Sequence, residues 1–196
     1  MRNLVSKFKK MVSLEIDKTW TLFLDRDGVI NEKRENDYVK NWNEFSFING
    51  SLFAISNLSK IFGKIIIVTN QRGVGRCLMK EEDLIYIHGK MIYEINLNFG
   101  RIDKIYYCLE VLENADCRKP NIGMGLKAKN DFPEIDFSKS IMVGDSKSDI
   151  KFGENLGMKK ILIGINEGLL NIDGRFDSLF EFSNFLKTQV FKTNQF

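Results

Sequence analysis

The stretch from Leu22 to Asn31, LFLDRDGVIN, places two carboxylates directly after a short apolar run. The run itself suits a β-strand that is buried on both faces, because such strands are short and continuously apolar. Asp25 and Asp27 follow it at once, and Gly28 begins a turn. Carboxylates in this position indicate a site at the edge of a sheet rather than part of a hydrophobic core.

The rest of the chain repeats this pattern of short apolar runs followed by helix-length segments. Expected strands lie at 19–25, 65–68, 103–108, 139–145 and 159–164, and expected helices at 50–62, 80–99, 121–132, 148–158 and 178–191. The alternation predicts an α/β fold, a doubly wound parallel sheet with flanking helices. We expect a basic N-terminal arm over 1–18 and one domain over 19–196. The insertions near the expected site are short, so we expect no large cap domain.

Composition excludes several classes of protein. The 196 residues carry 29 basic and 26 acidic side chains, a net charge of +3 that does not favour binding to nucleic acid. No apolar run is long enough for a signal peptide core or a membrane span. Three cysteines fit a reducing cytoplasm. The single histidine, His88, argues against His-based triads, and we expect it to be a packed or surface residue without a ligand role.

Polar side chains follow three of the expected strands. Asp25, Thr69 and Asp145 each stand at the carboxyl end of a run, and these ends meet at one edge of a parallel sheet. Clustered carboxylates require a bound cation, and oxygen ligands favour Mg²⁺. A carboxylate beside such a cation can attack phosphorus, while Arg118 and Lys119 in the stretch CRKP can hold phosphoryl oxygens. The sequence therefore predicts phosphoryl transfer at this edge.

Four motifs in this order, DRDG, TNQ, RKP and GDSKSD, resemble those of the haloacid dehalogenase (HAD) superfamily. The longer stretches FLDRDGVIN and IIIVTNQRGVGR are similar to the D-glycero-D-manno-heptose 1,7-bisphosphate phosphatases and their histidinol-phosphatase relatives. The likeness extends from about residue 22 to residue 164. It implies a Mg²⁺-dependent phosphatase with a Rossmann-like HAD fold.

The resemblance also implies roles for individual residues. Asp25 matches the nucleophile and a metal ligand, and Asp27 matches the general acid and base, with its backbone carbonyl as a second ligand. Thr69 and Lys119 match the groups that steady the phosphoryl oxygens. Asp145 matches the remaining protein ligand of the metal.

Four further residues are expected to bind substrate. Asn70, Gln71 and Arg118 fall where the heptose phosphatases contact it, and Arg72 replaces a serine of the family at the pocket. Arg118 suits a second phosphate, because a guanidinium binds phosphate through two hydrogen bonds. Asp149 is expected to orient Lys119 or its loop rather than to bind the metal.

The stretch CLEVLENADCRKP departs from the family at a structural zinc site. Cys108 and Cys117 stand where the first and last zinc ligands would be, but Glu110 and Ala115 replace the other two. Structural zinc usually has four N or S ligands. We therefore expect no structural zinc and two free thiols. A weak three-ligand site and a disulfide formed on oxidation are the alternatives.

The function expected from this reading is that of a cytoplasmic, Mg²⁺-dependent hydrolase of a phosphorylated heptose. It would convert D-glycero-D-manno-heptose 1,7-bisphosphate to the monophosphate through an aspartyl-phosphate. A monomer is favoured. The alternatives are a phosphatase of another small metabolite, such as histidinol phosphate, and a non-catalytic member that keeps the fold as a binding module.

Overall fold

The computed structural model of the chain describes residues 15–165 and 171–193. Most of the expected basic arm, residues 1–14, lies outside the described part. Six strands form one sheet in the order β3-β2-β1-β4-β5-β6, and neighbouring strands are parallel throughout. They are β1 (Thr21–Leu24), β2 (Lys64–Asn70), β3 (Lys104–Cys108), β4 (Ser140–Gly144), β5 (Lys159–Ile163) and β6 (Gly174–Phe176).

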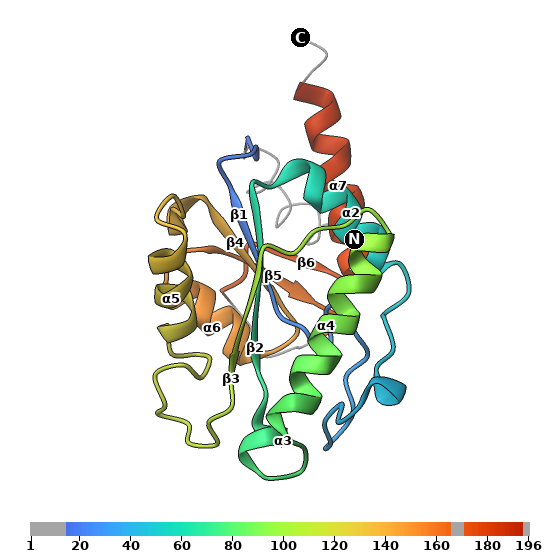
Figure 1. Ribbon diagram of the computed structural model, residues 1–196. Coiled ribbons are helices and arrows are strands. Elements are labelled where there is room, and N and C mark those ends of the chain that lie inside the picture. The colour runs from blue at the N-terminus through green and yellow to red at the C-terminus, as the bar shows by residue number, and fades with distance from the viewer. Residues whose placement is uncertain (1–14, 166–170, 194–196) are drawn as a thin grey trace.

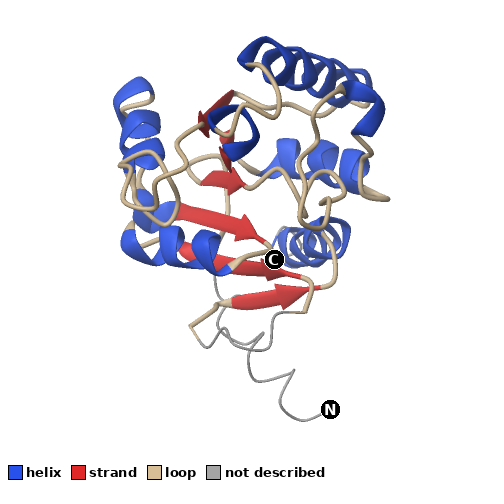
Figure 2. Ribbon diagram, turned by 90° about the horizontal axis from the view of Figure 1, so that it is seen from below, coloured by secondary structure: helices blue, strands red, loops and turns tan. Residues whose placement is uncertain are grey.

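Helices cover both faces of this sheet (Figure 1). One face carries α2 (Ser51–Ile61), α4 (Glu81–Leu97) and α7 (Leu179–Thr193), and the other carries α5 (Gly123–Asp131) and α6 (Lys147–Asn155). Figure 2 shows the strands between these two helical layers. The predicted doubly wound α/β fold is therefore confirmed.

Each central strand supplies side chains to both layers, because successive residues of a strand point to opposite faces. In β1, Leu22 and Leu24 belong to the core cluster beneath α2, α4 and α7. Phe23, between them, belongs to the second cluster, beneath α5 and α6. All three side chains are fully buried. This double burial explains why the strand sequences are continuously apolar.

The order of the strands determines where along the carboxyl ends of the sheet a ligand is expected to bind. The chain runs from β1 outward to β2 and β3, and then returns to β4 on the other side of β1. The connections therefore diverge between β1 and β4, and ligands of open parallel sheets bind at the carboxyl ends of the strands at such a point. Asp25 follows β1 and Asp145 follows β4.

All five expected strands and all five expected helices are present. Four short elements were not expected: β6, the helical turn α3 (Arg72–Gly75), and the 3-10 turns η1 (Trp42–Glu44) and η2 (Phe137–Lys139). Each has only three or four residues, too few to show a hydrophobic period. Among the described residues, no helix has both the length and the apolar character that a membrane span requires.

Candidate active site

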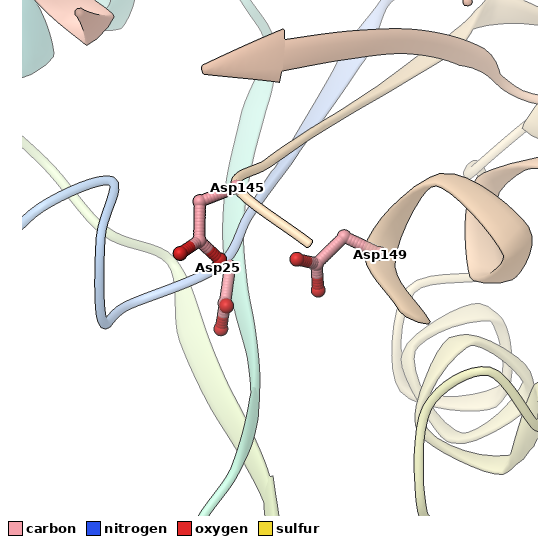
Figure 3. Close-up of side chains that lie close together, drawn as sticks. All are labelled: Asp25, Asp145 and Asp149. Atoms are coloured by element: carbon pink, nitrogen blue, oxygen red, sulfur yellow. The ribbon is translucent and has the colours of Figure 1, made fainter. Parts of the chain in front are cut away.

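Three aspartates meet at the carboxyl edge between β1 and β4 (Figure 3). Asp25 and Asp145 follow these strands, and Asp149 lies in the first turn of α6. One carboxylate oxygen of each lies within 4.8 Å of the others. The helix start fixes Asp149, whose Oδ2 accepts hydrogen bonds from the backbone N–H of Ser146 at 3.0 Å and from its hydroxyl at 2.6 Å. Three elements thus bring the carboxylates together.

The turn after β1 needs a glycine to reach this arrangement. Gly28 has a φ of +83°, in the left-handed region that residues with a side chain rarely adopt. A Cβ atom at this position would lie 2.4 Å from Asp145 Oδ2. Gly28 therefore allows the turn to approach the carboxylate of the neighbouring strand end.

Lys119 supplies a buried positive charge beside the aspartates. Its residue is 2% exposed, and its Nζ donates to the carbonyl of Val68 at 2.7 Å and to Asp149 Oδ1 at 2.5 Å. Asp25 Oδ1 lies 2.9 Å from the same nitrogen. The Asn70 side chain fixes the lysine's backbone, accepting from its N–H at 3.0 Å and donating to its carbonyl at 3.1 Å. Asp149 thus holds Lys119, as expected.

The site remains short of positive charge despite this lysine. Burial and the nearby Asp149 carboxylate raise the pKa of Asp25 to about 7. Burial also raises the pKa of Asp145, although Lys33 Nζ lies 2.6 Å from its Oδ2. The other oxygen of Asp145, Oδ1, is buried without a hydrogen-bond partner. Mg²⁺ prefers carboxylate oxygens as ligands, and Asp145 Oδ1 is an acceptor that is free to bind an ion. The residues of the site therefore fit Mg²⁺.

Asp27 is held differently from the three clustered aspartates. Arg26 Nη2 donates to both of its carboxylate oxygens, at 2.8 and 2.9 Å, and Asn31 Nδ2 donates at 2.9 Å. Burial acts to raise its pKa, but the Arg26 charge and these hydrogen bonds outweigh burial, so the pKa is lowered. The carboxylate is 25% exposed and borders the pocket. It can therefore reach a bound substrate while its orientation is fixed from behind.

Gln71 does not stand where a substrate contact was predicted. Its residue is 1% exposed, and its Nε2 donates to Asp27 Oδ2 and to Thr69 Oγ1, both at 2.8 Å. It does not border the pocket, whereas Thr69 does. The end of β2 turns the amide inward, so Gln71 connects two other site residues instead of facing the ligand.

Sequence reasoning missed two buried groups behind Asp27. Arg26 is 0% exposed, and its Nη1 lies 3.2 Å from Nε2 of His88. His88 lies on the buried stripe of α4 with Leu84, Ile87, Met91 and Ile95. Burial and the Arg26 charge lower its pKa to about 3. The signal was present in the sequence, because a polar residue on an apolar helix stripe needs a buried partner.

Folding should depend on pH through His88. Between its folded pKa of about 3 and its ordinary value of 6.5, the unfolded chain binds more protons, so the free energy of unfolding falls as pH drops below 6.5. From pH 7 to pH 5 we expect the wild type to lose about 2 kcal/mol more than His88→Gln, as measured by urea unfolding. Equal losses would show that His88 is not held neutral in the folded chain.

Asp25, Asp27 and Asp145 border a pocket of about 460 Å³. Arg72, Arg76 and Arg118 line it together with Asn70 and Tyr38. Arg118 is 9% exposed, and its Nη1 is buried without a hydrogen-bond partner. Burial and the positive charge of Arg72 lower the pKa of Arg118. Positive side chains that repel one another around an unpaired donor favour an anionic group between them.

Cys108 and Cys117 form a disulfide in the structure, so the expectation of two free thiols is wrong here. Cys108 ends β3, and the following loop returns to place the Cα atoms 5.4 Å apart, a separation that a disulfide spans. The bond lies next to Arg118 and Lys119 in the chain. Cys77, the remaining cysteine, is exposed and free.

Comparisons with known proteins agree with this site. A family model described as HAD-hydrolase-like matches residues 116–167. A D-glycero-alpha-D-manno-heptose-1,7-bisphosphate 7-phosphatase from Campylobacter jejuni is 39% identical over 176 residues, which cover 87% of this chain and 97% of that protein. The chain belongs to this family of HAD phosphatases. It is accordingly a phosphoric monoester hydrolase.

Other heptose bisphosphate phosphatases match over similar lengths. The alpha-anomer enzyme of Mycobacterium tuberculosis is 35% identical over 88% of this chain and 94% of its own length. A beta-anomer enzyme from Vibrio cholerae is 38% identical over 72% of this chain and 80% of its own. The crystal structure of the D,D-heptose 1,7-bisphosphate phosphatase from B. bronchiseptica, complexed with magnesium and phosphate, has a TM-score of 0.80 and 27% identity. The structural match covers 87% of this chain and 99% of the B. bronchiseptica chain.

Proposed function

We propose that this HAD phosphatase removes the 7-phosphate of D-glycero-D-manno-heptose 1,7-bisphosphate in a Mg²⁺-dependent reaction. The observation that carries the proposal is a single pocket with two anion sites. Lys119 and the Mg²⁺ that Asp25 and Asp145 would hold form one, and the guanidinium of Arg118, whose Nη1 has no hydrogen-bond partner, forms the other with Arg72. A sugar with a phosphate at each end fits this arrangement. Relatives named for this activity support the choice of sugar.

The first chemical step uses Asp25 and Asp27. A carboxylate oxygen of Asp25 attacks phosphorus, and Asp27 gives a proton to the sugar oxygen that leaves. Arg26 lowers the pKa of Asp27 in the free enzyme, but the negative charge of a bound phosphate acts in the opposite direction and favours its protonated form. Lys119 and the Thr69 hydroxyl stabilise negative charge on the phosphoryl oxygens. Asp25, Asp145 and the backbone carbonyl of Asp27 would hold Mg²⁺, which when bound would supply positive charge beside the phosphoryl group.

The second step returns Asp25 to its starting state. Asp27, now without its proton, removes a proton from water, which attacks the phosphorus of the aspartyl-phosphate. Because one side chain acts first as an acid and then as a base, its orientation must serve both steps. Hydrogen bonds from Arg26, Asn31 and Gln71 provide that orientation.

A substrate panel tests the proposed function. It contains both anomers of heptose 1,7-bisphosphate, heptose 7-phosphate and histidinol phosphate, each with Mg²⁺ and with EDTA. We expect Mg²⁺-dependent phosphate release with the highest kcat/KM for one bisphosphate anomer. A higher value for histidinol phosphate would favour the alternative substrate. No turnover of any compound would favour a binding module.

Removal of Arg118 should affect the bisphosphate selectively. Its guanidinium faces an anion that the monophosphate lacks, so Arg118→Ala should raise KM at least about tenfold for heptose 1,7-bisphosphate and less than about twofold for heptose 7-phosphate. Lys127→Ala removes the same charge from an exposed position outside the pocket and should change neither value. Equal losses for both substrates would show that Arg118 serves the fold and not the second phosphate.

We also propose that residues 19–196 act as one domain and that the enzyme is a cytoplasmic monomer. The balanced charge and the metabolic relatives support this setting. In a reducing compartment the bond between Cys108 and Cys117 would open. Sedimentation of the reduced protein at assay concentration tests the monomer, and a concentration-dependent increase in mass would contradict it.

A further inference from the structure

The side chain of Arg26 points away from the pocket that its neighbours Asp25 and Asp27 border. It is 0% exposed, whereas both aspartates line the pocket. The guanidinium nevertheless returns to the back of the Asp27 carboxylate, where Nη2 contacts both oxygens. A fully buried guanidinium is costly unless its donors are used. The guanidinium of Arg26 therefore needs hydrogen-bond acceptors at its other nitrogens if it is to stay in the position that holds Asp27.

His88 accepts the hydrogen bond from the other end of this guanidinium. Arginine can only donate, so Nε2 of His88 must carry a lone pair, and the ring proton belongs on Nδ1. The pKa of about 3 keeps the ring in this neutral form at all ordinary pH values. One buried line of contacts thus runs from α4 through His88 and Arg26 to Asp27.

The packing of α4 fixes the position of His88, the first residue in this line of contacts. It lies in the middle of α4, on the stripe that packs against the sheet, and its ring contacts that of Tyr107 at 5.6 Å between centroids. Arg26 Nε is already buried without a partner. Without His88, Nη1 would also be unpaired, and the guanidinium would shift toward another acceptor, taking its hold on Asp27 with it.

We propose that His88 is a positioning residue for catalysis, which acts through Arg26 to fix the carboxylate of Asp27. The proposal rests on the role of Asp27 as acid and base in the proposed function. It does not depend on which sugar phosphate is the substrate, because every substrate needs Asp27 to activate water in the second step.

The test uses p-nitrophenyl phosphate, whose leaving group needs no proton. Formation of the aspartyl-phosphate should then stay fast in His88→Leu, while its hydrolysis slows. We expect kcat to fall about tenfold or more, with a burst of roughly one nitrophenolate per active site before the slow phase. His88→Gln keeps an acceptor at this position and should restore most of kcat and abolish the burst. Tyr107→Phe, which removes only the hydroxyl bonded to Glu81, is the matched control and should behave as wild type.

The outcomes separate positioning from packing. A merely structural role would lower the steady rate in proportion to the fraction of folded sites and would produce no burst, and this result would overturn the proposal. Unchanged kinetics in His88→Leu would overturn it too. If His88→Leu does not fold, Arg26→Lys takes its place, because lysine keeps the charge but cannot contact both partners, and it should show the same burst. Failure of the wild type on heptose bisphosphate, with turnover of the aryl phosphate, would contradict only the proposed substrate.

Discussion

Asp25→Asn should reduce phosphate release from heptose 1,7-bisphosphate to the background rate, a loss of at least about a thousandfold in kcat. The amide is close to the carboxylate in shape, but it is neutral and cannot attack phosphorus. It also weakens the charge that would hold Mg²⁺ between Asp25 and Asp145. The measurement is steady-state phosphate release with Mg²⁺ in excess.

The fold should survive this substitution. Burial and Asp149 already disfavour the charge of Asp25, so a neutral amide relieves repulsion among the aspartates. Thermal unfolding should therefore show no loss of stability. Asp131→Asn, at a carboxylate bonded to Lys104 and Tyr106 away from the pocket, is the control and should retain activity. A sizeable residual kcat in Asp25→Asn would rule out the covalent mechanism.

Asp27→Asn should separate the two chemical steps. With an aryl phosphate the leaving group departs without a proton, so Asp25 is still phosphorylated, but no base remains to activate water. A burst of roughly one equivalent of phenolate should be followed by turnover slowed at least about a hundredfold. Rapid mixing with p-nitrophenyl phosphate measures both phases.

The natural substrate gives the complementary result for this variant. The sugar oxygen of heptose 1,7-bisphosphate is a poor leaving group that needs the proton of Asp27, so Asp27→Asn should show neither a burst nor turnover with it. Wild-type enzyme should turn over both compounds. Steady turnover of the aryl phosphate at the wild-type rate, without a burst, would remove Asp27 from the role of acid and base.

Much of the fold could be predicted because its strands are buried on both faces. Residues such as Phe23 and Ile66 lie in continuous apolar runs. Because helix-length segments separate these runs, the pattern predicts a parallel sheet. Sheet topology then places Asp25, Thr69 and Asp145 at one edge without further information. β6 was missed because three residues at the edge of a sheet, with Gly174 among them, carry no recognisable pattern.

The finer contacts of the site join residues that lie far apart in the chain, and one sequence does not reveal which of them meet. His88 and Arg26 are 62 positions apart and meet only when α4 packs on the sheet. The resemblance to the heptose phosphatases predicts a substrate contact for Gln71, but the turn into α3 directs its amide to Asp27. The bond between Cys108 and Cys117 likewise depends on the path of the intervening loop, which has no periodic pattern.

The covalent step at Asp25 is tested most directly by locating the phosphorylated residue. Asp27→Asn is mixed with p-nitrophenyl phosphate, quenched in acid during the slow phase and reduced with borohydride, which converts an aspartyl-phosphate to homoserine. Peptide mass spectrometry then reads the sequence around β1. Homoserine at position 25, absent from protein that never met the substrate, is the predicted result. Modification at another residue, or none despite a full burst, would contradict the mechanism.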